Sequence, residues 1–319
     1  MHVVCPGADR LDGSVRVWGC GGGDAFGWPG ALTRLRQRPR RLADAGWFCF
    51  RAARRLRALS RVDAFVAHFM LPSALLPPVG IGELEVVGHG SDLRLFEQLP
   101  ALARAAIVAG LLRRGATFRL SSAAGRRSLA RSLPSWLADR LLERSRVALP
   151  EVEVPPIDRD ARHRRRAALC SDDDVLVALC GRLVDAKRFH LALDAVGAAG
   201  AVALVIGDGP ARASLEDRVA ERGIPTRFVG RRSRPEALLD LCCADLLVHP
   251  STQEGAPTVI REARALGVPV VCCACGDVET WAEGDDGLLV VTDDDLGPAV
   301  VAQLEKRSTN RAPLDVLSR

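Results

Sequence analysis

The second half of the chain alternates continuous apolar runs with longer stretches of helical spacing. The apolar runs are rich in β-branched residues and lie at 175–180, 202–206, 227–229, 246–249, 268–273 and 288–291. The helical stretches lie near 187–199, 211–222, 235–242, 258–266 and 277–283. Wholly apolar strands separated by helices of about 10–15 residues are typical of a parallel sheet covered on both faces. The carboxyl ends of such strands meet at one edge, where ligands bind in doubly wound folds.

The first half follows the same pattern less regularly. Its expected elements are strands at 63–69, 84–89 and 117–122 and arginine-rich helices near 31–60 and 93–114. A segment at 150–166 contains Pro155-Pro156 and a run of basic residues, which is typical of a linker that leads into a helix. We therefore predict an α/β protein with two Rossmann-like domains in series, residues 1–158 and 159–319.

Composition is that of a globular protein. Of the 319 residues, 48% are hydrophobic and 26% are charged, which excludes a disordered chain, a collagen-like fibre and a coiled coil. Arginines interrupt every apolar stretch before it reaches the ~18–20 residues of a membrane span. The first residues lack the basic and apolar regions of a signal peptide. We expect a cytoplasmic protein.

Charge divides the chain unevenly. Residues 1–170 hold 28 arginines and 15 acidic residues, a net charge of +13, whereas residues 171–319 hold 16 basic and 24 acidic residues, a net charge of −8. Lys187 and Lys306 are the only lysines, so a lysine inside a motif is more informative than an arginine. Aromatic residues make up 4% of the chain and no recognition motif is present, which argues against a nucleic-acid partner.

The 10 cysteines are too sparse for a disulfide scaffold. They include Cys242-Cys243 and a cluster at 272–275, both surrounded by apolar residues. No second cysteine or histidine pair stands at zinc-ligand spacing. We interpret these cysteines as small buried hydrophobic residues.

A loop rich in glycine and proline connects the strand ending at 249 to a helix that begins near 258. The first N–H groups of such a helix lack partners within the helix and can bind phosphate. Glu254 lies in the loop and Glu262 lies about one turn inside the helix, so one carboxylate can stand beside a sugar and the other can accept ribose hydroxyls. The alternative is a pair of solvated glutamates, which the helix dipole favours at this end.

In this region the sequence resembles the retaining GT-B glycosyltransferases of family 4, also called group 1. The resemblance rests on Pro250-Ser251, Glu254, Glu262-Ala263 and the segment 265–270, which follow one another at the family's spacing. Further matches, in the family's order, are Gly181-Arg182 with Lys187, the turn 207–210, the segment 228–230, and the segments 276–279 and 287–290. The resemblance covers about 174–295.

The resemblance implies roles for individual residues. Arg182 and Lys187 would hold the donor diphosphate, where two fixed cations stabilise the charge that develops on the leaving group. Glu254 would position the sugar and stabilise positive charge at its anomeric carbon. Gly209 would let the backbone approach the ligand closely, unless it only forms a tight turn. The other implied donor contacts are Val229, Gly255, Ala256, Pro257, Thr258, Val259 and Glu262.

In the first half, the segment 87–92 resembles the family's strand-end His-Gly-Ser-Asp motif. The resemblance implies that His89 reaches across the cleft toward the donor sugar or the acceptor hydroxyl. The alternative is a buried histidine bonded to a backbone carbonyl, and His68 is expected to be structural. Residues 1–7 resemble the second strand of the family's first domain, so we expect the first βα unit to be missing. The chain also ends after one helix at about 295–306.

These observations predict a GT-B enzyme (EC 2.4 type) whose two Rossmann-like domains face each other across a cleft. It would transfer a hexose from a nucleotide-diphosphate sugar to a glycan, lipid or small-molecule acceptor, with retention, in polysaccharide or glycolipid biosynthesis. No D-x-D motif stands at a crevice position, so we expect no metal ion and no other cofactor. Two alternatives remain open: a sugar-nucleotide epimerase, for which Asp92 is the candidate acidic residue, and an impaired remnant that keeps the nucleotide-sugar site.

The basic first half leaves peripheral contact with the anionic inner face of the membrane open. Basic residues that flank apolar ones favour such contact, and the alternative is an arginine-rich surface in water. The basic residues concerned are Arg34, Arg36, Arg38, Arg40, Arg41, Arg51, Arg54, Arg55 and Arg57. The apolar residues among them are Leu35, Trp47, Phe48, Phe50 and Leu56.

Overall fold

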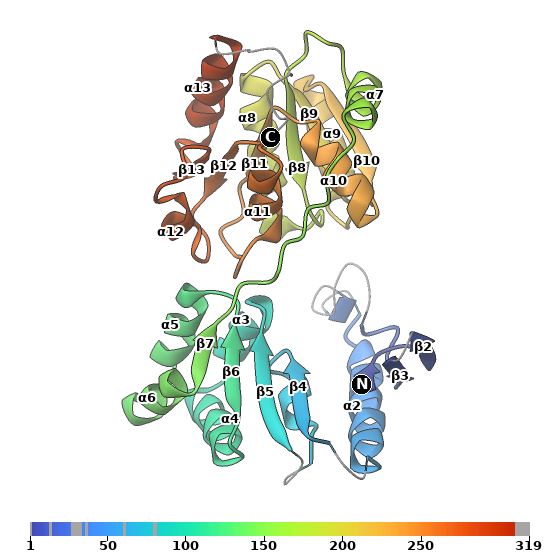
Figure 1. The fold of residues 1–319 in the computed structure, drawn as a ribbon, viewed down its shortest axis with the longest axis vertical. Coiled ribbons are helices and arrows are strands. Elements are labelled where there is room, and N and C mark those ends of the chain that lie inside the picture. Colours follow the sequence, from blue (N-terminus) through green and yellow to red (C-terminus); the bar gives the residue numbers. More distant parts are fainter. Residues whose placement is uncertain are drawn as a thin grey trace. The chain divides into compact units, whose positions relative to one another are not determined.

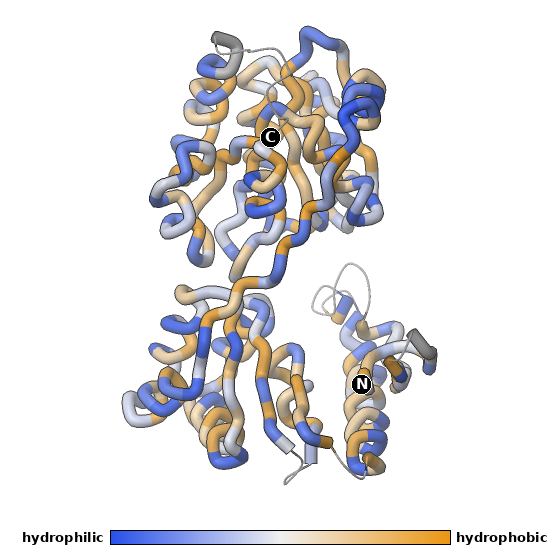
Figure 2. The backbone as a smooth tube through the Cα atoms, in the orientation of Figure 1, coloured by the Kyte–Doolittle hydropathy of each residue, from blue (hydrophilic) through white to orange (hydrophobic). Residues whose placement is uncertain are grey.

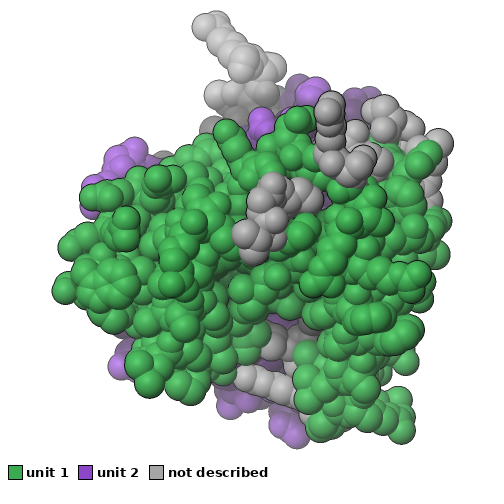
Figure 3. Space-filling model, turned by 90° about the horizontal axis from the view of Figure 1, so that it is seen from below, with its two compact units in different colours: residues 1–149 green, residues 150–319 purple. Residues whose placement is uncertain are grey.

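The structure is a computed structural model that describes residues 2–12, 15–26, 34–35, 38–59, 62–78 and 82–309. The chain divides into two compact units, Met1–Leu149 and Pro150–Arg319 (Figure 3). The predicted boundary stood at 158, so the segment 150–158 belongs with the second unit. Two arginines of that unit account for this placement: Arg261 donates to the carbonyl oxygen of Pro150, and Arg234 donates to that of Glu153.

Unit 2 is a six-stranded parallel sheet in the order β10-β9-β8-β11-β12-β13 (Figure 1). Its strands are β8 (Leu176–Cys180), β9 (Val202–Ile206), β10 (Thr226–Gly230), β11 (Leu246–His249), β12 (Val270–Cys273) and β13 (Leu288–Val291). Its helices are α7 (Arg159–Leu169), α8 (Phe189–Ala198), α9 (Arg212–Arg222), α10 (Arg234–Cys242), α11 (Thr258–Ala265), α12 (Val278–Ala282) and α13 (Leu296–Thr309). The strands and helices predicted for the second half are thus confirmed.

Alternate residues of each strand in unit 2 enter different cores. In β8, Leu176 and Ala178 lie in the core under α10 and α11, whereas Val177 and Leu179 lie in the core under α8 and α13. The strands are therefore apolar on both faces. They correspond to the orange, hydrophobic segments of unit 2 in Figure 2. The cysteine cluster follows the same alternation, because Cys272 belongs to the first core and the adjacent Cys273 to the second.

Unit 1 contains a four-stranded parallel sheet in the order β4-β5-β6-β7. The strands are β4 (Ala64–His68), β5 (Glu83–Gly88), β6 (Thr117–Leu120) and β7 (Ser145–Val147). The helices are α2 (Arg41–Arg57), α3 (Ser91–Glu97), α4 (Ala101–Arg113), α5 (Ala123–Arg131) and α6 (Ser135–Glu143), with a 3-10 turn at Ser73–Leu75. The single helix predicted near 93–114 is two helices, because Pro100 has no N–H to continue the first and instead precedes α4.

A separate three-stranded sheet begins unit 1. It consists of β1 (His2–Cys5), β2 (Arg10–Asp12) and β3 (Val15–Gly19), in the order β1-β3-β2. The strand at residues 2–5, which resembles the family's second strand, pairs here with β3 in parallel and not with the four-stranded sheet. Phe48 and Ala52 of α2 form a small core with Cys20 beside this sheet.

Candidate active site

The loops that follow β8, β9 and β10 pack as one layer at the carboxyl edge of the unit 2 sheet. Leu183 N–H donates to the carbonyl oxygen of Asp208 at 2.9 Å, and Gly207 N–H donates to that of Gly230 at 2.9 Å. Gly209 has a φ of +157°, and a Cβ there would lie 2.3 Å from the carbonyl oxygen of Leu183. Gly209 thus lies close to the neighbouring loop, and its predicted close approach to a ligand stays a prediction.

The strand order of unit 2 reverses between β8 and β11, and the loops after these two strands carry Lys187 and Glu254. Lys187 ends the 3-10 turn Asp185–Lys187, and its Nζ forms an ion pair with Glu254 Oε1. The two side chains are only 16% and 22% exposed, and Ser251 Oγ donates to the same carboxylate oxygen at 3.2 Å. Doubly wound folds bind their ligands at this switch point.

Glu254 is held in its charged form. Burial raises the free energy of a carboxylate, but the positive charge of Lys187 and the hydrogen bonds from Lys187 and Ser251 outweigh burial. The pKa of Glu254 consequently lies below its ordinary value. The site thus presents a fixed negative charge at neutral pH.

His249 ends β11 and is almost fully buried beside this ion pair. Neither of its ring nitrogens has a hydrogen-bond partner among the residues that the structure describes. Burial, followed by repulsion from Lys187, lowers the pKa of His249 to about 3. The imidazole is therefore neutral throughout the physiological range, and we did not single it out from the sequence.

Arg188 connects the loop after β8 to three other loops and strands. Its Nε donates to the carbonyl oxygen of Pro250 at 2.9 Å, and its Nη1 donates to Asp293 at 2.8 Å. Its Nη2 donates to the thiol sulfur of Cys273 at 3.5 Å. Arg188 has a φ of +53°, a left-handed conformation that only its surroundings stabilise in a residue with a Cβ. We missed this residue because its partners lie more than sixty positions away, while its neighbour Lys187 matched the motif.

The predicted phosphate-binding residues lie at the start of α11. Pro257 is the N-cap, and its side chain does not cap the helix. Gly255 precedes it in a tightly packed loop, since a Cβ on Gly276 would lie 2.0 Å from the Gly255 carbonyl oxygen. The side chain of Val259 is buried in the core, so only the backbone of Val259 can serve a ligand. Gly255, Ala256, Pro257, Thr258 and Val259 thus form one continuous turn into the helix.

Glu262 lies within α11 and forms an ion pair with Arg234 Nη1 at 2.6 Å. Its side chain is 12% exposed, so it is not one of the solvated glutamates of the alternative interpretation. Arg182 follows β8 and is exposed. Val229 is half-buried against the core, at a point where the register of β10 against β9 shifts by one residue.

In unit 1, His89 directly follows β5 at the carboxyl edge of the sheet. Its Nε2 lies 3.0 Å from Nδ1 of His68, the last residue of β4. Both oxygens of the buried Asp92 accept backbone N–H groups, from His89 at 2.8 Å and from Met70 at 2.9 Å. His89 is therefore paired with a side chain and not with a backbone carbonyl, and His68 belongs to the same cluster.

Comparison with known proteins was made for both sequence and structure. Residues 174–306 match the family model described as "Glycosyl transferases group 1". This part of the chain is similar to that family. It contains Lys187, His249, Glu254 and Glu262 and ends within α13.

Two curated relatives illustrate how far the similarity extends. The putative teichuronic acid biosynthesis glycosyltransferase TuaC of Bacillus subtilis is 38% identical over 130 residues, which is 40% of this chain and 31% of that protein. A GDP-mannose-dependent alpha-mannosyltransferase of Mycobacterium tuberculosis is 31% identical over 243 residues, which is 70% of this chain and 59% of that protein. The chain thus spans less than two thirds of the length of these relatives.

Solved structures share the fold of the chain. The Anabaena protein Alr3699/HepE in complex with UDP-glucose aligns with a TM-score of 0.67 at 16% identity, covering 96% of this chain and 90% of that one. Sucrose-phosphate synthase from Thermosynechococcus elongatus aligns with a TM-score of 0.72 at 16% identity, covering 97% of this chain and 79% of that one. At this identity the likeness concerns the fold, and it confirms the predicted α/β class with Rossmann-like domains of the GT-B kind.

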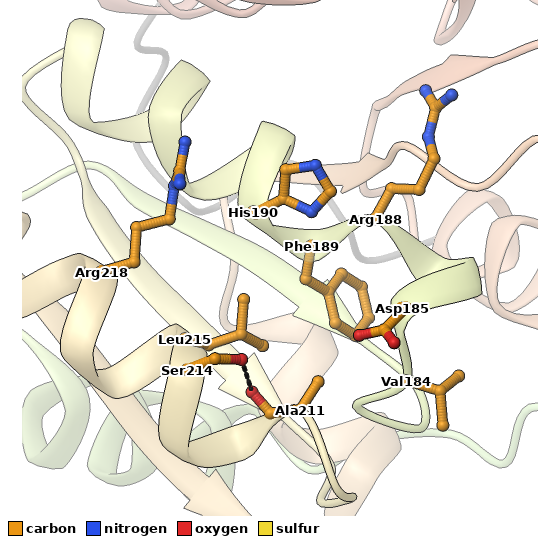
Figure 4. A pocket seen from close by; sticks show the side chains of 9 residues that line it. All are labelled: Val184, Asp185, Arg188, Phe189, His190, Ala211, Ser214, Leu215 and Arg218. Atoms are coloured by element: carbon orange, nitrogen blue, oxygen red, sulfur yellow. Dashed lines mark hydrogen bonds between the residues drawn. The ribbon is translucent and has the colours of Figure 1, made fainter. Parts of the chain in front are cut away.

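A pocket of about 190 Å³ opens beside the first turns of α8 and α9 of unit 2 (Figure 4). It is lined by Val184, Asp185, Arg188, Phe189, His190, Ala211, Ser214, Leu215 and Arg218. None of these is a predicted site residue, and two of its polar side chains have partners: Ser214 Oγ donates to the Ala211 carbonyl oxygen, and Arg218 pairs with Asp194. We therefore assign the site to the switch point and not to this pocket.

No group of three or more histidine, cysteine or acidic side chains among the described residues is arranged to hold a metal ion. No helix formed by those residues is long and apolar enough to cross a membrane.

Proposed function

We propose that the chain transfers a hexose from a nucleoside-diphosphate sugar to an acceptor hydroxyl, with retention of configuration and without a metal ion. The observation that carries the proposal is the largely buried Lys187–Glu254 ion pair at the strand-order switch point. Two relatives, a putative glycosyltransferase and a GDP-mannose-dependent alpha-mannosyltransferase, support the same class of reaction. The complex of the fold neighbour HepE with UDP-glucose supports a nucleotide-sugar donor.

The ion pair suits a reaction in which a diphosphate leaves. The ammonium group of Lys187 has three N–H donors, of which Glu254 needs one, so others remain for phosphate oxygens. Arg182 adds a second cation at the end of β8. These cations stabilise the leaving group most when its charge is fully developed, in the transition state. Glu254, kept ionised by Lys187, then faces the positive charge that forms at the anomeric carbon.

Retention follows if the acceptor oxygen attacks from the face that the diphosphate leaves. The bond between the anomeric carbon and the diphosphate oxygen breaks, the bond to the acceptor oxygen forms, and the acceptor proton passes to the departing phosphate. No protein nucleophile is required. His89 would contact the donor sugar or the acceptor hydroxyl, since an imidazole can donate or accept a hydrogen bond near neutral pH.

The nucleotide would occupy the start of α11 and the neighbouring loops. The first N–H groups of α11, at Thr258 and Val259, attract phosphate because they lack partners within the helix. Glu262 would accept the ribose hydroxyls, and its bond to Arg234 would keep the carboxylate in one orientation. Val229 would lie beside the base, and Gly209 would bring the backbone of its loop close to the ligand.

Calorimetric titration with UDP and with GDP tests the donor site. Replacing Lys187 by Ala should weaken binding of the preferred nucleotide by about 1–3 kcal/mol, the loss expected for a hydrogen bond to a charged group. Lys306→Ala is the matched control, because Lys306 is the only other lysine and lies near the end of α13. Equal nucleotide affinities of the wild type and Lys187→Ala would contradict the role of Lys187 in binding the donor diphosphate.

Product analysis separates the transferase from its alternatives. A transferase releases nucleoside diphosphate from UDP-glucose or GDP-mannose, an epimerase changes the sugar without releasing it, and a remnant binds without turnover. Turnover that is equal in EDTA and in MgCl₂ is the result expected for a metal-independent enzyme. An epimerase is not favoured, because both carboxylate oxygens of Asp92 already accept backbone N–H groups.

We further propose peripheral contact of α2 with an anionic membrane, which would bring a lipid-linked acceptor within reach. Trp47 and Phe50 stack with ring centroids 5.5 Å apart and are more than half exposed, and Arg51 and Arg54 follow on the same helix. Exposed aromatic residues next to arginines suit the boundary of a bilayer. Arg55 is not available, because it packs on Trp18 and pairs with Asp9, and Arg36 lies outside the described residues.

A further inference from the structure

The carboxyl edge of the unit 1 sheet holds a pair of histidines in direct contact. His68 ends β4 and His89 follows β5, and the register of these adjacent strands places His68 opposite Val87, two residues before His89. Nδ1 of His68 lies 3.0 Å from Nε2 of His89, and the two rings are stacked with planes 14° apart. This distance is that of a hydrogen bond.

The backbone around the pair is fixed on both sides. Asp92 accepts the N–H of His89 with one oxygen and the N–H of Met70 with the other, so it ties the loop after β5 to the loop after β4. Phe69 has a φ of +75°, donates its N–H to Val87, and places its ring 4.8 Å from the His89 ring. A phenylalanine keeps this left-handed conformation only where its surroundings impose it.

The contact couples the tautomers of the two rings. A neutral imidazole has one N–H donor and one acceptor nitrogen, so one histidine must donate and the other must accept. If His89 donates through Nε2, its Nδ1 is an acceptor; if His68 donates through Nδ1, His89 carries its proton on Nδ1. Neutral histidine in water favours the Nε2–H tautomer. Both rings keep this tautomer only when His89 is the donor and His68 the acceptor.

Protonation reverses the arrangement. The charged groups that face His89 are Asp92 of α3, which favours a positive charge, and Arg119 of β6, which opposes it together with His68. Burial of His89 outweighs these effects and lowers its pKa, which disfavours a positive charge on this ring. With an extra proton in the pair and His89 neutral, Nδ1 of His68 must donate to Nε2 of His89, which moves the proton of His89 to Nδ1.

We propose that His68 is a positioning residue that sets whether Nδ1 of His89 accepts or donates a hydrogen bond: it accepts while the pair is neutral and donates once the pair holds an extra proton. No other residue in the described part of the chain hydrogen-bonds to Nδ1 of His89, which leaves this atom for a ligand. That the ligand is a sugar hydroxyl rests on the proposed function, whereas the pairing itself does not.

Nitrogen-15 NMR of the imidazoles tests the pairing without any substrate. The chain has 6 histidines, and His89→Gln identifies the signals of His89. In the wild type we expect His89 to be the Nε2–H tautomer at high pH and to become the Nδ1–H tautomer as the pH falls and the pair takes up a proton. His68→Asn retains a group that can hydrogen-bond but cannot titrate, so the tautomer of His89 should no longer depend on pH. An unchanged tautomer across the wild-type titration overturns the proposal, even if His68→Ala fails to fold.

Steady-state kinetics provide the functional test. His68→Ala should lower kcat by about tenfold through misplacement of His89, with little change in the donor KM. His68→Asn should recover most of this loss, and His163→Ala, on the exposed side of α7, is the control that should change neither value. Tautomer changes without any turnover in the wild type would contradict the proposed function and leave the pairing intact. Full activity of His68→Ala would contradict the role of His68.

Discussion

Glu254 and Glu262 stand eight positions apart in one motif, yet their surroundings give them different chemistry. Glu254 is paired with Lys187 at the switch point and, in the proposed reaction, would act on the anomeric carbon. Glu262 is paired with Arg234 on the helix and would hold the ribose. A ribose contact is equally strong in the ground state and the transition state, whereas a contact with developing charge is not.

This difference predicts different kinetic defects. Glu262→Ala should mainly raise the donor KM, and Glu254→Ala should mainly lower kcat. Initial rates over a range of donor concentrations measure both values for each variant. The reverse pattern would show that the two carboxylates have exchanged roles.

The buried His249, whose ring has no hydrogen-bond partner in the part of the chain that the structure describes, predicts a pH dependence of stability. In the folded state its pKa is about 3, whereas in the unfolded chain it returns to an ordinary value near ~6.5. Between these values the unfolded chain binds more protons, so stability falls as the pH drops through this window, by at most about 1.4 kcal/mol per pH unit. His249→Leu should abolish this contribution and stabilise the protein at pH 5 relative to the wild type.

Urea unfolding at pH 7.5, 6 and 5 measures this effect. His163→Gln serves as the control, because His163 is exposed and its replacement should leave the pH dependence unchanged. If the free energy of unfolding of the wild type and of His249→Leu fell equally with pH, His249 would have a hydrogen-bond partner in solution.

At the scale of helices, strands and loops, the site depends on how the loop after β8 is attached to its neighbours. Arg188 holds this loop to Pro250, before Glu254, and to Asp293, after β13. Lys187 and Glu254 thus keep their positions partly through a residue that takes no part in the chemistry.

Arg188→Ala should therefore lower stability by about 1–3 kcal/mol, since buried acceptors lose a charged donor. It should also weaken donor binding, because the loop that carries Lys187 is no longer fixed. Urea unfolding and nucleotide titration check the two effects. Arg222→Ala, which removes an exposed arginine at the end of α9, is the control; equal effects of both variants would contradict a positioning role.

At the scale of the whole molecule, the charge division favours an anionic surface as the partner of the first unit. Residues 1–149, the first unit, hold 23 arginines and 11 acidic residues, a net charge of +12, and α2 exposes Trp47 and Phe50 among its arginines. Each cation near an anionic surface contributes about 1 kcal/mol to binding. This attraction decays with distance over about one Debye length, so added salt weakens it.

Flotation with phosphatidylglycerol vesicles tests this contact. Binding should appear at low salt and fade as the salt concentration rises, and replacing Trp47 and Phe50 by Ser should weaken it. Trp136→Ser, at another exposed aromatic residue of unit 1, is the control. A protein that does not float with anionic vesicles at low salt would point to a soluble acceptor.

The sequence by itself determined the order of elements in unit 2 and the residues of its donor motif. This was possible because fully buried parallel strands are continuously apolar, and because Glu254, Lys187 and the glycines stand at short, fixed spacings from strand ends. In unit 1 the helices α5 and α6 and the strand β7 were not predicted. Arginine and serine interrupt the few large apolar residues of α5, and β7 has only three residues.

Only the tertiary structure decided which distant residues meet. The pairing of His68 with His89, the attachment of Arg188 to Pro250 and Asp293, and the isolation of His249 all depend on strand order and register. Local hydrophobic periodicity carries no information about which strands become neighbours, because burial on both faces looks the same at every position of the sheet. The ionic and hydrogen-bonding character of each site residue is therefore set by contacts that form only when the sheets assemble.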